Sequence, residues 1–127
     1  MSRAYAGQPR VLLCIDDSPS VLDYERRILE KSGYIVVTEL SARRALRLAN
    51  IFSFDAVLLD YHMPEMNGHQ FASEIRRLRP DTPMVMFSGS EIPAETRQLV
   101  DAVVHKAEVP SELLPIVTRL CDRSSPD

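Results

Sequence analysis

The chain lacks the features that mark secreted, membrane-spanning or nucleic-acid-binding proteins. Its two cysteines, Cys14 in a predicted core strand and Cys121 near the end, are too few and too unlike in setting for a disulfide framework. The formal net charge of -3 is too mild to indicate binding to nucleic acid or to a membrane surface. No apolar run approaches the roughly 20 residues of a membrane-spanning helix, and the first residues lack the apolar core of a signal peptide. These absences predict a cytoplasmic protein.

What the sequence does contain is a set of short apolar runs, each followed at once by a polar side chain. The runs cover residues 11–15, 56–59, 84–87 and 102–105. Each has the length of a buried β-strand, and helical patterns lie between them, so strands and helices alternate as in a parallel α/β sheet. We therefore predict an N-terminal extension over residues 1–9, one α/β domain over residues 10–122 and a tail over residues 123–127.

Capping residues predict where the helices begin and end. Ser18 and Pro19 suit the first positions of a helix, and Gly33 suits its end. Ser41 suits the start of a second helix. Pro115 falls inside the last predicted helix, where its ring removes one backbone hydrogen bond, so we expect a kink or a late start there.

The polar side chains after the apolar runs are expected in one pocket, because parallel strands end at the same edge of a sheet and ligands bind there. They are Asp16, Asp17, Asp60, Ser88 and Lys106. Three carboxylates repel one another unless a cation joins them, and Mg²⁺ is the hard cation that suits carboxylate oxygens. The hydroxyl and the ammonium group suit an anion. A phosphoryl group accepted by an aspartate fits this set best.

These residues resemble those of a response regulator receiver domain of two-component signalling. From residue 60 to residue 68 the chain reads Asp-Tyr-His-Met-Pro-Glu-Met-Asn-Gly, which is similar to the family's phosphoacceptor loop. The aspartate pair, Ser88 before a glycine, and Lys106 also match. The resemblance extends over nearly the whole chain. It implies a flavodoxin-like, doubly wound sheet of five parallel strands in the order 2-1-3-4-5, with helices on both faces.

The resemblance also implies an acceptor and a metal site. Asp60 would accept the phosphoryl group, and Asp60 and Asp17 would bind Mg²⁺ through their side chains. Asp16 would act on the metal mainly through water, and the backbone carbonyl of His62 would be a further ligand.

The other positions receive roles in the same way. Ser88 and Lys106 would hold phosphoryl oxygens. His62 lies two residues after the acceptor and Ser90 two residues after Ser88, so either side chain could tune hydrolysis of the aspartyl-phosphate. A solvated loop histidine is an equal alternative for His62. His69 is expected on a helix surface.

The segment before the lysine departs from the family. Ser88 and Lys106 are 18 residues apart, fewer than is usual, so we predict a short or irregular fourth helix. Val103 stands where the family has a switch aromatic, and Ala107 follows the lysine where the family has proline, so no cis bond is expected. Phosphorylation is therefore expected without the usual aromatic switch. Activation would instead order or shift residues 90–99, and a fixed loop is the alternative.

The expected function is signalling rather than enzymatic. The flanks are too short for an output module, so we expect a stand-alone receiver that takes a phosphoryl group from a histidine kinase or phosphotransfer protein. It would phosphorylate and dephosphorylate itself with Mg²⁺ and act on an unknown protein target, and a homodimer across the last helix stays open.

Two alternative functions remain. One is a phosphorylation-independent interaction domain on the same fold. The other is a phosphatase of the haloacid dehalogenase type, which would need an Asp-x-Asp motif and a cap. Here Asp16 and Asp17 are adjacent and there is no cap-sized insertion.

Overall fold

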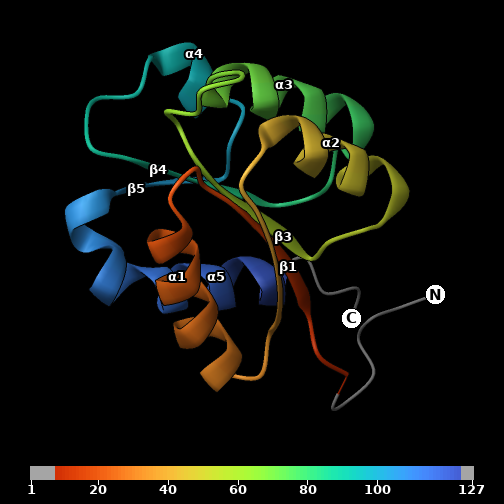
Figure 1. The fold of residues 1–127 in the computed structure, drawn as a ribbon, viewed down its shortest axis with the longest axis vertical. Coiled ribbons are helices and arrows are strands. Elements are labelled where there is room, and N and C mark those ends of the chain that lie inside the picture. Colours follow the sequence, from red (N-terminus) through yellow and green to blue (C-terminus); the bar gives the residue numbers. More distant parts are fainter. Residues whose placement is uncertain (1–7, 124–127) are drawn as a thin grey trace.

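A computed structural model describes residues 8–123, so most of the predicted extension and tail lie outside the described residues. The sheet confirms the predicted fold. All strand pairs are parallel and their order is β2-β1-β3-β4-β5 (Figure 1). The strands are β1 (Val11–Ile15), β2 (Ile35–Glu39), β3 (Ala56–Asp60), β4 (Met84–Ser88) and β5 (Ala102–His105).

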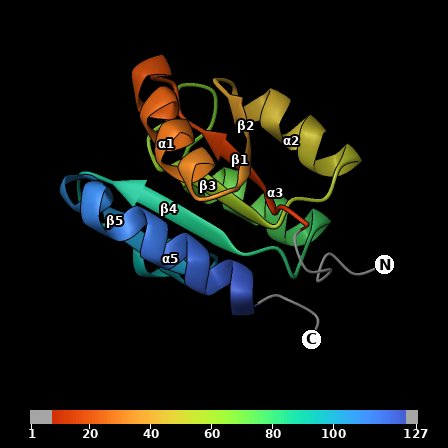
Figure 2. The same cartoon turned by 90° about the horizontal axis from the view of Figure 1, so that it is seen from below.

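Helices cover both faces of the sheet (Figures 1 and 2). One face carries α1 (Pro19–Lys31) and α5 (Val109–Arg123), and the other carries α2 (Ala42–Ile51), α3 (Gly68–Leu78) and α4 (Ala94–Arg97). A short 3₁₀ turn, η1 (Lys106–Glu108), leads into α5.

Each strand supplies both cores because its side chains alternate between the faces. On β1, Leu12 and Cys14 join the cluster under α1 and α5. Leu13 and Ile15 join the cluster under α2 and α3. Cys14 and Cys121 are both buried, in the cluster under α1 and α5.

The predicted caps form. The Ser18 hydroxyl accepts from the Val21 N–H at 3.4 Å, and the Ser41 hydroxyl accepts from the Arg44 N–H at 3.2 Å. Gly33 follows α1 with φ +93, a conformation that side chains disfavour.

The predictions for the two helices with a proline, α4 and α5, have different outcomes in the structure. The fourth helix is short, as predicted, with only four residues after Pro93. The late start expected for the last helix is wrong: α5 begins at Val109 and continues through Pro115. Its buried residues Leu113 and Val117 pack on the sheet on either side of the proline, which offsets the lost backbone bond.

Two further observations concern the backbone of the described residues. None of their peptide bonds is cis. None of the helices in residues 8–123 is both long and apolar enough to cross a bilayer.

Candidate functional site

Three carboxylates meet at the carboxyl edge of the sheet. Asp16 directly follows β1, and Asp60 is the last residue of β3 rather than the residue after it. Each of these two is 2% exposed, whereas Asp17 is exposed. The three residues offer carboxylate oxygens that all lie within 4.8 Å of one another. The sequence prediction that these side chains share a pocket is therefore correct in geometry.

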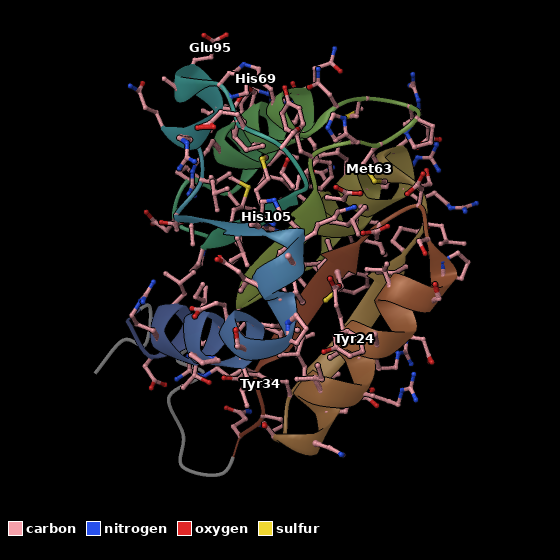
Figure 3. All side chains as sticks on the ribbon, turned by 90° about the vertical axis from the view of Figure 1, so that its left-hand side faces the viewer. Tyr24, Tyr34, Met63, His69, Glu95 and His105 are labelled. Carbon is pink, nitrogen blue, oxygen red and sulfur yellow. The ribbon has the colours of Figure 1, made fainter. Side chains whose placement is uncertain are left out.

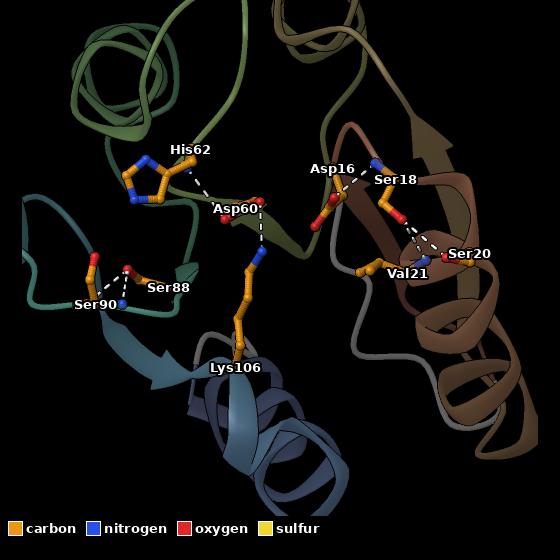
Figure 4. Close-up of polar contacts among 9 residues, drawn as sticks. All are labelled: Asp16, Ser18, Ser20, Val21, Asp60, His62, Ser88, Ser90 and Lys106. Atoms are coloured by element: carbon orange, nitrogen blue, oxygen red, sulfur yellow. Dashed lines mark hydrogen bonds and ion pairs between the residues drawn. The ribbon is translucent and has the colours of Figure 1, made fainter.

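Lys106 reaches the same point from η1. Its Nζ lies 2.9 Å from Oδ2 of Asp60 (Figure 4). Partial burial alone would lower the pKa of Lys106, but the hydrogen bond to Asp60 and the nearby carboxylates raise it. The ammonium group is thus held charged against the buried acid.

Backbone N–H groups fix the two buried aspartates. The Ser18 N–H donates to Oδ1 of Asp16 at 2.9 Å, and the His62 N–H donates to Oδ1 of Asp60 at 3.3 Å. Burial raises the pKa of Asp16 to about 6, against the lowering effect of the Ser18 bond and with a further rise from Asp60. A cation beside Asp16 would favour its ionised form.

The loop after Asp60 folds tightly onto α3. The Gly68 N–H donates to the Tyr61 carbonyl at 2.7 Å, and a Cβ on Gly68 would lie 2.9 Å from the Tyr61 Cα. Only glycine fits there without a shift, so this position controls the path of the loop. His62 is exposed, and its ring packs edge-on against Tyr61 with centroids 5.0 Å apart.

Ser88 is brought to the edge but its hydroxyl is occupied. It donates to the Ser90 carbonyl at 2.8 Å and accepts from the Ser90 N–H at 3.1 Å, as Figure 4 shows. Because a hydroxyl has one proton, Ser88 cannot donate elsewhere while this bond lasts. Ser90 itself is exposed.

Val103 and Ser88 border an open hollow. Val103 is half-buried on β5, and a cavity of about 410 Å³ beside it is lined by Ser88, Ser90 and His105 among others. His105 has a local structural contact, because its Nδ1 accepts from the Ala107 N–H at 3.1 Å.

Sequence reasoning missed a buried acid next to the site. Glu25 on α1 is 2% exposed. Burial, with the nearby Asp16 and Asp60, raises its pKa to about 8. A signal was present in the sequence, because Glu25 falls between the buried Leu22 and Leu29 at helical spacing and so faces the core.

The contacts that hold α4 were also missed. His69 was expected on a helix surface, but it is half-buried and its Nδ1 makes a 2.8 Å hydrogen bond with the hydroxyl of buried Thr96 (Figure 3). Arg76 on α3 donates to the Leu99 carbonyl at 2.8 Å and pairs with Asp101 at 2.6 Å. No sequence pattern indicates these pairs, because they join segments that only the fold brings together.

Comparison with known proteins agrees with this geometry. A family model described as the response regulator receiver domain matches residues 12–114. The transcriptional regulatory protein GlrR of Escherichia coli is 32% identical in an alignment of 123 residues that covers 94% of this chain and 28% of that protein. The chain thus spans little more than a quarter of the length of this relative.

Solved structures share the fold. A CheY-like receiver domain protein from Methanospirillum hungatei has a TM-score of 0.84 at 26% identity, over 91% of this chain and 96% of that one. The response regulator TrrA of Thermotoga maritima, solved in complex with Mg²⁺ and BeF, has a TM-score of 0.82 at 26% identity, over 87% and 98%. The chain belongs to the response regulator receiver domain family, the phosphoaccepting, Mg²⁺-dependent signalling domains of two-component systems.

Proposed function

We propose that Asp60 accepts a phosphoryl group from a histidine kinase or phosphotransfer protein. The observation that carries the proposal is the setting of this carboxylate. It is buried at the end of β3, its Oδ2 is paired with Lys106 at 2.9 Å, and its Oδ1 accepts from the His62 N–H. Family membership supports the same residue, because receiver domains are phosphorylated on an aspartate.

Mg²⁺ would be held by Asp16, Asp17 and Asp60. Their oxygens lie within 4.8 Å of one another, and carboxylates are the ligands that this hard cation prefers. We add the backbone carbonyl of His62 as a further ligand. TrrA, a response regulator of the same fold, was solved in complex with Mg²⁺ and BeF, which supports Mg²⁺ as the ion for this cluster. When bound, Mg²⁺ would neutralise charge on the phosphoryl oxygens.

The transfer needs little from the protein beyond position and charge. An oxygen of Asp60 attacks the phosphorus of a phosphohistidine, the P–N bond breaks, and its electron pair stays on the imidazole of the donor. Lys106 stabilises the charge of the resulting aspartyl-phosphate. The domain would promote this transfer to itself, and in dephosphorylation water would attack the phosphorus, break the P–O bond to Asp60 and release inorganic phosphate.

Ser88 would connect occupancy of the site to the segment before α4. Its hydroxyl proton is donated to the Ser90 carbonyl. If Ser88 donated to a phosphoryl oxygen instead, its hydrogen bond to Ser90 would break. The turn at residues 88–90 would then loosen and shift residues 90–99, without an aromatic at Val103. His62 and Ser90 are both exposed near the acceptor, so both stay candidates for tuning hydrolysis.

We assign the receiver domain to residues 10–122, with residues 1–9 and 123–127 as flanks. Its output would be a protein surface that an unknown target recognises, and the cytoplasmic location and a homodimer across α5 belong to the same proposal.

Labelling by acetyl phosphate with Mg²⁺ tests the proposed function. Intact-mass spectrometry should show one phosphoryl group on the folded wild type and none on Asp60→Asn. Asp81→Asn changes an exposed aspartate in the loop before β4 and serves as the matched control, which should label like the wild type. A folded wild type that does not label would overturn the proposal in favour of a phosphorylation-independent interaction domain.

A further inference from the structure

A second cavity, of about 250 Å³, lies between α1 and the start of α5 beside the acidic cluster. Its walls are mostly apolar, and they include Val21, Tyr24, Phe87, Val109 and Pro110. Asp16 lines it and also belongs to the acidic cluster, and Lys106, which lines it too, pairs with Asp60 of that cluster. Since a cavity of about 150 Å³ holds benzene, this one has room for an extended aliphatic side chain.

Glu25 is the group that distinguishes this cavity from an ordinary apolar hollow. The residue lines the cavity although it is only 2% exposed. Its hydrogen-bonding neighbour is the thiol of Cys14, a weak partner. None of the ion pairs within the described part of the chain includes Glu25. A buried carboxyl without a cation is costly, and an apolar residue would pack there more favourably.

The cations near Glu25 are engaged elsewhere. Arg26 donates to the Thr38 hydroxyl at 3.0 Å, and Arg27 pairs with Asp23 at 3.0 Å. Lys106 is bound to Asp60. Burial and the neighbouring Asp16 and Asp60 raise the pKa of Glu25, and the lowering effect of Lys106 is too small to offset them.

We propose that this cavity receives a lysine or arginine side chain of the protein that donates the phosphoryl group. The cationic head group pairs with Glu25, and the aliphatic stem packs against Val21, Val109 and Pro110. An apolar side chain would instead seal Glu25 in without a partner.

The inference rests on the proposed function, and the position of the cavity supports a basic side chain of the phosphoryl donor as its occupant. A phosphohistidine must come within bonding distance of Asp60. Because Asp16 lies in both places and Lys106 joins the cavity wall to Asp60, the surface of a donor that reaches Asp60 also covers the cavity. A basic side chain on that surface complements the surplus of carboxyl groups there, which favours both encounter and orientation.

Side-chain analogues test the chemistry of the cavity directly. ¹H–¹⁵N spectra are recorded with n-butylguanidinium and n-butylammonium, with n-butanol and butyrate as neutral and anionic controls. Saturating Mg²⁺ occupies the acidic cluster, so that the probes report on the cavity. The two cations should shift amides of α1 and the start of α5 saturably, and more strongly than butanol or butyrate.

Variants on α1 decide whether Glu25 is responsible. Glu25→Gln should abolish the preference for the cations, and Glu30→Gln, which changes an exposed glutamate on the same helix, should keep it. Equal response to butanol, or an unchanged cation preference in Glu25→Gln, would overturn the inference.

A protein donor tests the biological use of the cavity. The specificity constant kcat/KM for a purified phosphorylated histidine kinase that labels Asp60 is divided by the rate constant for acetyl phosphate. In Glu25→Gln this ratio should fall about tenfold through KM. An unchanged ratio would overturn the inference alone, whereas a wild type that neither donor labels would overturn the proposed function.

Discussion

The two sides of the sheet edge differ in how far their polar groups are already in place. On the β1 and β3 side, Asp16 and Asp60 are buried, and each accepts a backbone N–H bond that fixes its carboxylate. On the β4 side, the Ser88 hydroxyl donates its proton to the Ser90 carbonyl, within its own turn. The acidic side needs only a cation, whereas the serine side must break a bond before it can bind a phosphoryl oxygen.

The segment beyond Ser88 is also held differently from the rest of the fold. A helix of four residues is too short to be stable alone, because helix nucleation costs more than a few hydrogen bonds return. The position of α4 therefore depends on contacts with α3, chiefly the His69–Thr96 hydrogen bond and the Arg76–Leu99 bond. The acceptor pocket and the segment that would report its occupancy therefore differ in local stability.

The largest effect is expected at the ion pair between Lys106 and Asp60. Lys106→Met removes the ammonium group beside Asp60, and the initial rate of labelling by acetyl phosphate should fall by about 10²-fold or more. Lys31→Met, at the exposed end of α1, is the control and should label normally. A rate for Lys106→Met within about twofold of the wild type would mean that the 2.9 Å ion pair is structural only.

The pH dependence of the free energy of unfolding tests the burial of Glu25 on the acidic side of the sheet edge. Glu25 ionises near its ordinary pKa of 4.5 when unfolded but near 8 when folded. The folded state therefore binds more protons, and the stability falls as pH rises through this window. Between about pH 5 and pH 7 in EDTA, the free energy of unfolding should fall by roughly 2 to 3 kcal/mol because of Glu25, at about 1.4 kcal/mol per pH unit.

The Glu25→Gln variant isolates this contribution. Asp16, whose pKa rises from 3.8 to about 6, titrates in both proteins. The difference between the wild type and Glu25→Gln in urea unfolding at each pH therefore reports Glu25. A difference that does not change between pH 5 and pH 7 would contradict the burial of an uncompensated carboxyl.

The contrast also explains which features the sequence could predict. Asp16, Asp17, Asp60 and Lys106 sit next to strand ends, so apolar runs and topology together determine where they meet. The short α4 was predictable from the spacing between Ser88 and the lysine. These features depend on chain order and local pattern, and the structure has them where they were expected.

The other features were missed either because a residue type was misleading or because the contacts join distant segments. Glu25 lies on the apolar stripe of α1, but its charge made a solvent-facing position the default. His69 and Thr96 are 27 residues apart and meet only because α4 packs on α3. Pro115 was expected to kink α5 or delay its start, and the delay did not occur because burial on either side of the proline outweighed one lost hydrogen bond.

Thr96→Val tests the attachment of α4 with a smaller expected effect. It removes the hydroxyl bonded to His69 while keeping the shape of the side chain, at a cost of about 1 kcal/mol. Amide hydrogen exchange across α4 should speed up by about fivefold, while exchange in β1 and β3 stays unchanged. Thr118→Val is the control. It removes an exposed hydroxyl on α5 that accepts a hydrogen bond from Tyr34, and it should leave α4 unaffected. Unchanged amide exchange in α4 would mean that the hydrogen bond from Arg76 to Leu99, rather than the His69–Thr96 bond, holds the helix.

The smallest effect is expected from restoring a ring on the serine side. Val103→Phe places a ring at a half-buried position beside a cavity of about 410 Å³, so the free energy of unfolding should change by less than about 1 kcal/mol. Val104→Phe, at the adjacent residue, points a ring into the closed core, where overpacking should cost about 1 to 3 kcal/mol. Urea unfolding of both variants measures the contrast. If Val103→Phe is as destabilising as Val104→Phe, the hollow beside Ser88 is closed in solution. The wild type would then have no room for a ring, and the missing aromatic would reflect packing rather than a different way of reporting occupancy.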